Sequence, residues 1–409
     1  MAAPTFGVSS GSYTSLQTVT ISTTTAGAAI YYTTDGSTPT ASSRVYGGPV
    51  SVASTIVLKA IATASGYADS EVASSTYTMN AGGASLSGLP ILSRSGVPKP
   101  VGAAGGLKVL DWAGFKSAAT YTFDDSLPSQ ISNYPQLQAT GVRMTFFLIG
   151  ASDYDSPTWA QAAKDGHELG NHTEHHCLAN GTVCGCVTTG TECTVRPSSG
   201  SIETEYDECT AHIKQTYGVG NVWTTAAPHG DSGYNPVAKT RFFLNRGVGP
   251  GQIAPNDKTD PYALRVYPVD TGDTASIFNS QIDSAHSAGK WLIFMFHSLG
   301  GDGGYHPVEV SELTASVTHA QSLGDVWIDN MVNVGAYWSG QDAITNGITT
   351  QLGNDTVLTW SLPSHFPSGK FVRVTVTGGT LMQGGSVLPW NDAGYYEIAI
   401  DPGSLTISR

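Results

Sequence analysis

The stretch Thr120-Tyr-Thr-Phe-Asp-Asp125 is an apolar run that ends abruptly in two carboxylates. Short apolar runs bounded by polar residues are typical of buried strands. Two further runs of this kind are Met144-Thr-Phe-Phe-Leu-Ile149 and Trp291-Leu-Ile-Phe-Met-Phe296. Stretches with helical periodicity lie between and after them, at residues 159–164, 202–217, 277–288 and 308–323. This alternation over residues 107–340 predicts a parallel sheet or an α/β barrel.

The sequence on either side of this region has a different pattern. Residues 4–79 and 343–409 consist of short alternating runs separated by turn residues, which predicts a β-sandwich at each end of the chain. Residues 80–106 are rich in small residues and proline, and we expect a linker there. The join after residue 340 is short, so the C-terminal sandwich is expected to pack against the barrel.

Composition restricts the class of protein. The 409 residues are 12% charged and 40% hydrophobic, which excludes a disordered tail protein and a coiled coil. Acidic residues outnumber basic ones by 32 to 19, for a net charge of −13, so neither nucleic acid nor an anionic membrane is an expected partner. There is no apolar run of membrane-spanning length and no signal-peptide pattern at the start. We expect a soluble mature or trimmed form that acts as a monomer.

All five cysteines fall within residues 177–209, in a stretch rich in Gly, Thr and Ser. Such clustering favours a secreted or extracellular protein with one or two disulfides that hold a loop. A structural zinc knot is the competing interpretation, although Cys184 and Cys186 lack the two-residue gap of a zinc ribbon.

The two carboxylates at the end of the first run are candidates for chemistry. Consecutive strand residues point to opposite sides, so the carboxylates of Asp124 and Asp125 can have different chemical roles. The strand end of a barrel is also where active sites form. Taken alone, the pair also fits a helix N-cap or a turn.

A second segment that could contribute to chemistry is Gly166-His-Glu-Leu-Gly-Asn-His-Thr-Glu-His-His176. His172 and His176 stand four residues apart and can meet one divalent ion if the segment is helical or tightly turned. Solvated surface histidines are the ordinary alternative. His175 is a third candidate on a different face, and His167 is expected on the surface.

Two histidines and one carboxylate leave an open position for water, as in catalytic zinc sites. The chemistry expected of such a site is metal-assisted hydrolysis. His297 ends the strand-like run that starts at Trp291 and supplies an acid or base at the same rim. A strand-end histidine that bonds only to backbone is the alternative.

Together these residues, over about 118–340, resemble the polysaccharide deacetylases, also called carbohydrate esterase family four or the NodB-like family. Their fold implies a distorted (β/α) barrel here, flanked by the two sandwiches of a multidomain chain. Thr122-Phe-Asp-Asp125 is similar to the first family motif, which implies that Asp124 is the catalytic base and Asp125 a metal ligand. His172-Thr-Glu-His-His176 is similar to the second motif and implies the other two ligands, His172 and His176.

Two further motifs are matched in part. Trp223-Thr-Thr-Ala-Ala-Pro-His-Gly230 resembles the third motif, which implies that the backbone N–H of His229 faces an oxyanion. Met295-Phe-His297 resembles the fifth motif, whose histidine is the general acid.

The departures from the family pattern raise two questions. Ala226 stands where the third motif has the arginine that holds the base, and the replacement candidates are Arg241, Arg246 and Arg265, which the sequence does not rank. Asp270-Thr-Gly-Asp-Thr274 matches the fourth motif only in part, and this match implies Asp270 or Asp273 as a possible partner of the acid His297.

The resemblance implies a secreted hydrolase with one divalent metal ion, zinc by preference, that removes acetyl groups from a polysaccharide or oligosaccharide. An N-acetylglucosamine polymer and acetylated xylan both fit. The alternative is a catalytically impaired deacetylase fold that acts as a glycan-binding or adhesive protein. Tyr31-Tyr-Thr-Thr-Asp-Gly-Ser-Thr-Pro39 resembles the immunoglobulin-like module of chitobiases, either a spacer or a carbohydrate-binding module.

Overall fold

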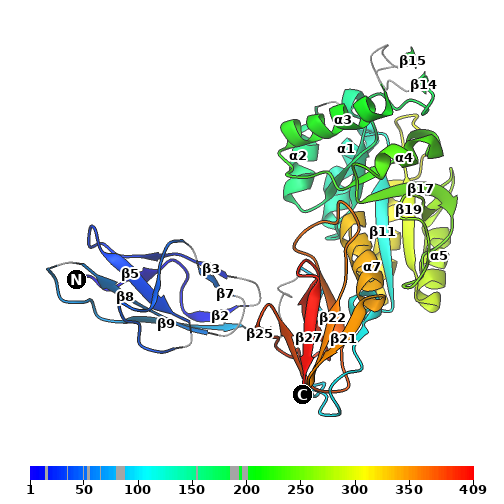
Figure 1. Ribbon diagram of the computed structural model, residues 1–409. Helices are drawn as coiled ribbons and strands as arrows, with labels where there is room; N and C mark the ends of the chain where they lie inside the picture. Colours follow the sequence, from blue (N-terminus) through cyan, green and yellow to red (C-terminus); the bar gives the residue numbers. More distant parts are fainter. Residues whose placement is uncertain are drawn as a thin grey trace. The chain divides into compact units, whose positions relative to one another are not determined.

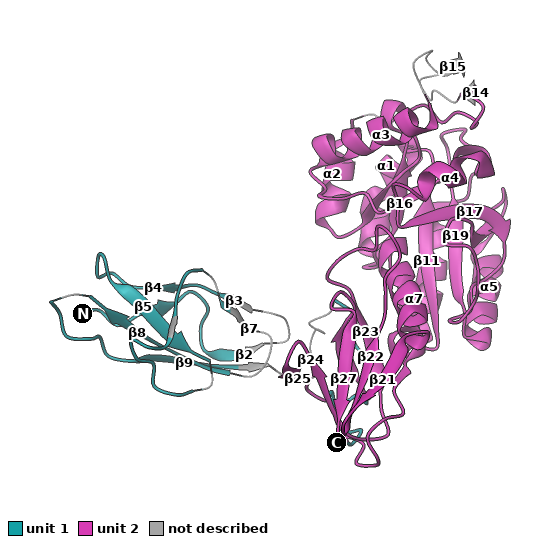
Figure 2. Cartoon of the chain, in the orientation of Figure 1, with its two compact units in different colours: residues 1–98, 391–394 teal, residues 99–390, 395–409 magenta. Residues whose placement is uncertain are grey.

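The computed structural model describes residues 1–13, 17–34, 36–48, 50–52, 56–64, 66–79, 88–152, 155–184, 193–195 and 201–409. The chain divides into two compact units, coloured separately in Figure 2. The first unit comprises Met1–Pro98 with Asn391–Gly394, and the second comprises Lys99–Trp390 with Tyr395–Arg409.

The first unit is built from short strands, as the alternating pattern predicts. The strands are β1 (Thr5–Phe6), β2 (Gly11–Tyr13), β3 (Gln17–Val19), β4 (Ile21–Ser22), β5 (Ala29–Thr33), β6 (Arg44–Val45), β7 (Val50–Val52), β8 (Ile56–Thr63) and β9 (Ala73–Met79). They form a sheet in the order β2-β9-β8-β5-β6, with the pairs β3-β7 and β1-β4 beside it. Val19, Leu58 and Tyr77 are fully buried in the core of this unit.

A closed ring of parallel strands forms the centre of the second unit (Figure 1). Its members are β11 (Ser117–Phe123), β12 (Thr145–Leu148), β13 (Glu168–Asn171), β16 (Thr224–Ala226), β17 (Leu244–Pro250), β18 (Leu264–Pro268) and β19 (Trp291–Phe296). Strand β11 pairs with both β12 and β19, which closes the ring, and β20 (Val326–Ile328) pairs with β11 as well. The expected (β/α) barrel is therefore confirmed.

The barrel strands are buried because helices cover them from outside (Figure 1). These helices are α1 (Pro128–Ala139), α2 (Pro157–Lys164), α3 (Ile202–Tyr217), α4 (Asn235–Ala238), α5 (Ala275–Ala288), α6 (Val310–Ser322) and α7 (Met331–Thr345). Every residue of β11, β12 and β19 is buried, which explains their nearly continuous apolar runs. Phe123 stacks on Phe146 at 4.9 Å and Tyr121 on Phe294 at 5.1 Å in this core.

The C-terminal part of the second unit contains antiparallel sheets. The strands are β10 (Lys108–Val109), β21 (Ile348–Leu352), β22 (Asp355–Thr359), β23 (Phe371–Thr375), β24 (Thr380–Gln383), β25 (Ser386–Val387), β26 (Tyr396–Ala399) and β27 (Ser404–Ser408). One sheet has the order β21-β22-β27-β24-β25 and the other β10-β23-β26. Strand β10 thus joins the C-terminal sheets, although it precedes the barrel in sequence. The domain bounds 4–79, 80–106, 107–340 and 343–409 stay a prediction.

The expected packing of the C-terminal part on the barrel is present. The Arg373 N–H donates to the hydroxyl of Tyr337, on α7, at 3.2 Å, and Nζ of Lys370 donates to Oδ1 of Asn333, also on α7, at 2.6 Å. Arg373 is fully buried and donates to the Ala113 carbonyl at 2.9 Å. In the described part of the chain, no helix has both the length and the apolar character needed to cross a bilayer.

Candidate active site

Asp124 and Asp125 directly follow β11, at the end of the barrel where His297 directly follows β19. The buried amide of Gln130, on α1, links the two ends by donating to the Asp124 carbonyl at 2.5 Å and the His297 carbonyl at 2.9 Å. Asp125 has a φ of 77°, so the chain turns sharply there. The pair belongs to a turn, as one alternative proposed, but its carboxylates also face other polar groups.

The histidine segment after β13 is a tight turn and not a helix. Thr173 and His176 both have positive φ, at 68° and 52°, and the His176 N–H donates to Oγ1 of Thr173 at 3.0 Å. This turn brings the rings of His172 and His176 to a centroid distance of 4.7 Å. The expectation that a tight turn lets the two imidazoles share one side is confirmed.

Asp125, His172 and His176 meet around one point. Nε2 of His172 lies 3.3 Å from Oδ1 of Asp125, and Nε2 of His176 lies 3.5 Å from the same oxygen. One ligand atom from each of the three residues lies within 4.8 Å of the others. Oδ1 of Asp125 is buried and makes no hydrogen bond within the described residues. The three side chains therefore form a possible metal site.

The hydrogen bond behind His172 determines which nitrogen faces this point. Its Nδ1 lies 2.8 Å from the Ala226 carbonyl oxygen, which can only accept, so Nδ1 carries the proton. In the neutral imidazole, Nε2 then presents its lone pair toward Asp125, as a metal-binding imidazole must. The donor set of two imidazole nitrogens and one carboxylate oxygen fits a divalent cation such as zinc.

The electrostatics of the site also favour a cation. Burial raises the pKa of Asp125, but the contact with His172 and the nearby histidine charges outweigh this effect and lower that pKa below its ordinary value. Burial lowers the pKa of His172, but Asp124 and Asp125 outweigh it and raise that pKa. Burial and the charge of His172 lower the pKa of His176 to about 3. Positive charge is thus stabilised between these residues while His176 stays neutral.

Asp124 has a different set of neighbours. Its Oδ2 forms a buried ion pair with Nη2 of Arg246 and lies 3.7 Å from Nε2 of His297. Its Oδ1 is buried and has no hydrogen-bond partner in the part of the chain that is described. Burial lowers the pKa of His297, and Asp124 offsets part of this effect. One oxygen of Asp124 is therefore held while the other is available.

Arg246 resolves the question of the replaced arginine. Arg246 is 1% exposed, whereas Arg265 is exposed and Arg241 pairs with Asp207 at the surface. Strands β16 and β17 pair in parallel with Ala226 opposite Arg246, so the arginine lies one strand away from the motif position. The sequence could name Arg246 but could not select it, because selection required this register.

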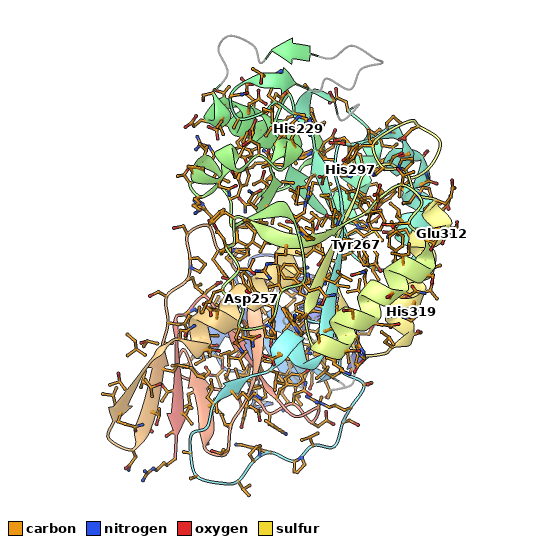
Figure 3. All side chains as sticks on the ribbon, turned by 90° about the vertical axis from the view of Figure 1, so that its right-hand side faces the viewer. His229, Asp257, Tyr267, His297, Glu312 and His319 are labelled. Carbon is orange, nitrogen blue, oxygen red and sulfur yellow. A yellow bond between two sulfur atoms is a disulfide. The ribbon has the colours of Figure 1, made fainter. Side chains whose placement is uncertain are left out.

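The three other histidines considered in the sequence, His229, His175 and His167, lie in different surroundings. His229 has a φ of 55° and its ring lies 4.5 Å from that of His176, which places it at the site (Figure 3). His175 points instead to the buried carboxylate of Glu205, with Nδ1 3.1 Å from Oε1. The expectation of a surface position for His167 is wrong: it is 6% exposed, and its Nδ1 accepts from the Met144 N–H at 3.0 Å.

Neither proposed acid partner is hydrogen-bonded to His297. Oδ1 of Asp270 lies 2.5 Å from Nδ1 of His306, and Oδ2 of Asp273 accepts from the Tyr267 hydroxyl at 3.0 Å. Nδ1 of His297 is buried and makes no hydrogen bond to any residue that the structure describes. The segment that resembles the fourth motif does not supply the contact, because its two carboxylates bind His306 and Tyr267.

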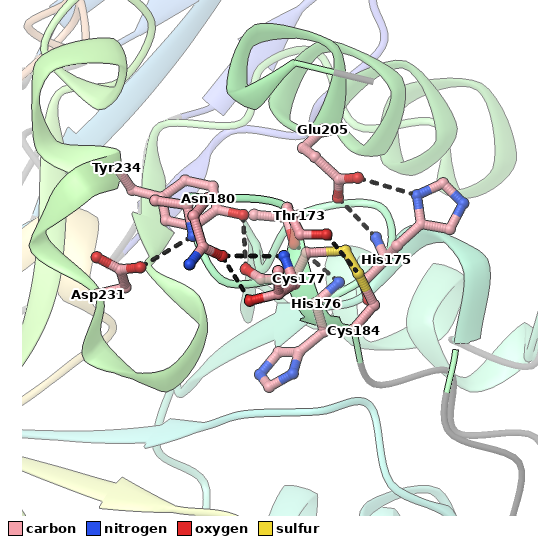
Figure 4. Close-up of a disulfide and its surroundings, with 12 residues drawn as sticks. Thr173, His175, His176, Cys177, Asn180, Cys184, Glu205, Asp231 and Tyr234 are labelled. Carbon is pink, nitrogen blue, oxygen red and sulfur yellow. Dashed lines mark hydrogen bonds and ion pairs between the residues drawn. A yellow bond between two sulfur atoms is a disulfide. The ribbon is translucent and has the colours of Figure 1, made fainter. Parts of the chain in front are cut away.

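A disulfide joins Cys177, the residue after His176, to Cys184 (Figure 4). The Tyr234 hydroxyl donates to the Cys177 carbonyl at 2.7 Å, and the Ala179 N–H donates to Asp231 at 2.9 Å. The bond confirms the expected disulfide and excludes both cysteines from a zinc knot. Cys209 is buried, whereas Cys186 and the side chain of Cys193 lie outside the described residues.

Replacing Cys177 and Cys184 together by serine is expected to weaken metal binding, since the bond closes the loop that follows His176. Loss of so short a closed loop costs about 2 kcal/mol of folding free energy. Thermal unfolding and a metal titration, each with and without reductant, measure the effects. Reductant should change the wild type and leave the double variant unaffected. Equal metal affinity of oxidised and reduced wild type would contradict the positioning role.

Comparisons with known proteins agree with the motifs. Residues 114–241 match the family model described as polysaccharide deacetylase. Residues 8–74 match the model described as the chitobiase/beta-hexosaminidase C-terminal domain. A search of curated proteins gave no match.

Several solved structures are similar to this chain. A family 4 acetyl xylan esterase from Clostridium thermocellum, in complex with a cobalt ion, has 15% identity and a TM-score of 0.35, over 53% of this chain and 89% of that one. A family 4 carbohydrate esterase from Streptomyces lividans, in complex with acetate, has 12% identity and a TM-score of 0.37, over 54% and 95%. A polysaccharide deacetylase from Bacillus cereus has 19% identity and a TM-score of 0.34, over 52% and 91%. The chain therefore contains one segment similar to the polysaccharide deacetylases and one similar to the chitobiase-type module.

Proposed function

We propose that this protein is a metal-dependent deacetylase that hydrolyses acetyl groups on an extracellular glycan. The observation that carries the proposal is the division of labour between adjacent carboxylates. Asp125 lies with His172 and His176, whereas Asp124 lies with Arg246 and His297. One carboxylate is thus suited to hold a cation and the other to accept a proton.

The proposed cation ligands are Asp125, His172 and His176. A divalent ion bound there, zinc by preference, would supply Lewis acidity toward the acetyl carbonyl and toward water. The donor set matches zinc, and Asp125 Oδ1 is a buried oxygen without a hydrogen bond among the described residues.

Asp124 is the proposed general base. Arg246 holds its Oδ2, which leaves Oδ1 to take a proton from the attacking water. The backbone N–H of His229 would face the negative charge that develops on the acetyl oxygen. His297 would donate a proton from Nε2 to the departing amine or alcohol.

The replaced motif arginine does not favour the alternative of an impaired, glycan-binding fold. Arg246 makes the buried contact with Asp124 that such an arginine would make. The substrate class stays open between an N-acetylglucosamine polymer and acetylated xylan, because one site can attack an amide or an ester. A disulfide supports secretion of the protein, which we propose to be a monomer.

Metal dependence is tested by elemental analysis and acetate release from a panel of acetylated glycans. We expect about one divalent ion per chain, loss of activity with a chelator, and recovery when the ion is restored. His172→Ala and His176→Ala are expected to lose the ion. His319→Ala is the control, because that histidine pairs with Asp283 at the surface. Full activity of both site variants without metal would exclude the proposal.

A further inference from the structure

An exposed aromatic side chain lies beside the proposed general acid. Tyr305 is 61% exposed, and its ring centroid lies 4.9 Å from that of His297, with the two planes at 78°. Nε2 of His297 lies 3.7 Å from Oδ2 of Asp124. Isolated exposed aromatics are ordinary on protein surfaces. Tyr305 differs because its ring lies beside His297, whose own ring faces the proposed reaction centre.

The loop that carries Tyr305 is fixed from within. It joins β19 to α6, and the Ser298 N–H donates to the Tyr305 carbonyl at 3.3 Å. The carboxylate of Asp302 accepts from the Ser129 N–H and from the Gly304 N–H, each at 3.0 Å. These bonds attach the loop to the start of α1.

The loop is also fixed at the residue after Tyr305. Nδ1 of His306 lies 2.5 Å from Oδ1 of Asp270, at the end of the adjacent strand β18. The ring of Tyr305 lies 3.8 Å from that of His306 and is nearly perpendicular to it. An aromatic ring that is already held in place can bind a ligand with little further loss of conformational entropy.

We propose that Tyr305 forms the aromatic wall of a sugar subsite next to His297, an inference that rests on the proposed function. A pyranose ring has an apolar face of C–H groups and a polar edge of hydroxyls. Tyrosine matches this chemistry because its ring is apolar and its hydroxyl is polar. Covering the ring with a sugar face removes apolar surface from water. Tyr305 therefore contributes binding of the sugar and no proton transfer.

The test compares two substrates in the full-length, metal-loaded protein. With an acetylated oligosaccharide, Tyr305→Ala is expected to raise KM about tenfold and to change kcat little, because stacking is lost from bound substrate and transition state alike. With 4-nitrophenyl acetate, which has no sugar, the variant is expected to equal the wild type. Tyr305→Trp should retain the wild-type KM. Leu352→Ala is the matched control, since Leu352 is also 61% exposed and lies on β21.

Two kinetic results would overturn the subsite. An unchanged KM for the oligosaccharide would show that Tyr305 does not bind sugar. An equal loss of kcat on both substrates would show that the ring acts through His297 instead. A third measurement, calorimetric binding of the deacetylated oligosaccharide, separates this inference from the proposed function. If the wild type releases no acetate but binds sugar in a Tyr305-dependent way, only the proposed function fails. If neither occurs, both fail.

Discussion

Asp124→Asn is expected to lower the rate of acetate release by about a thousandfold while the protein keeps its metal ion. The amide oxygen of asparagine can still accept a hydrogen bond from Arg246, so the fold should persist. The amide cannot take a proton from water, however, and the reaction loses its base. Initial rates and the metal-to-protein ratio, measured on the same preparation, check both parts.

Asp125→Asn is the paired control for this experiment. Asp125 lies 3.3 Å from His172 and 3.5 Å from His176, so its replacement should release the ion as well as abolish turnover. Loss of the ion from Asp124→Asn and its retention by Asp125→Asn would exchange the two roles. Wild-type turnover by Asp124→Asn would exclude Asp124 as the base.

Arg246→Ala is expected to lower kcat by about a hundredfold and to destabilise the fold by about 3 kcal/mol, because it leaves the Asp124 carboxylate buried without its partner. The side chain is 1% exposed, and its guanidinium carbon also lies 5.5 Å from the centre of the Phe147 ring. Acetate release and thermal unfolding measure the two effects. Arg241→Ala, which removes a surface pair with Asp207, should change neither appreciably.

A double variant separates positioning of Asp124 from simple stability. Ala226 and Arg246 are register partners on neighbouring parallel strands, and residues paired in this way project from the same face of the sheet. The exchange Ala226→Arg with Arg246→Ala returns the guanidinium to the position of the third motif. We expect it to recover much of the kcat lost in Arg246→Ala. A folded, metal-loaded double variant without any recovery would show that only position 246 can serve.

Local sequence determined the barrel, because buried parallel strands need apolar residues on both faces. The runs at Thr120–Phe123, Met144–Ile149 and Trp291–Phe296 therefore stand out without any knowledge of the fold. The candidate metal ligands were also visible, since Asp125, His172 and His176 occupy two short segments with characteristic spacing. In contrast, the sequence did not predict the pairing of β10 with β23, because a two-residue strand before the barrel has no hydrophobic pattern of its own.

Tertiary structure decided which distant side chains complete the site. Arg246 was one of three equivalent arginines in the sequence, and only the register of β16 and β17 places it against Asp124. His167 was expected outside, but the strand that follows it carries it into the core, where backbone and side-chain partners satisfy its ring. Asp270 and Asp273 have the spacing of a motif, yet their carboxylates bind His306 and Tyr267. A sequence motif determines which ligands lie close along the chain, whereas contacts between strands depend on how the barrel closes.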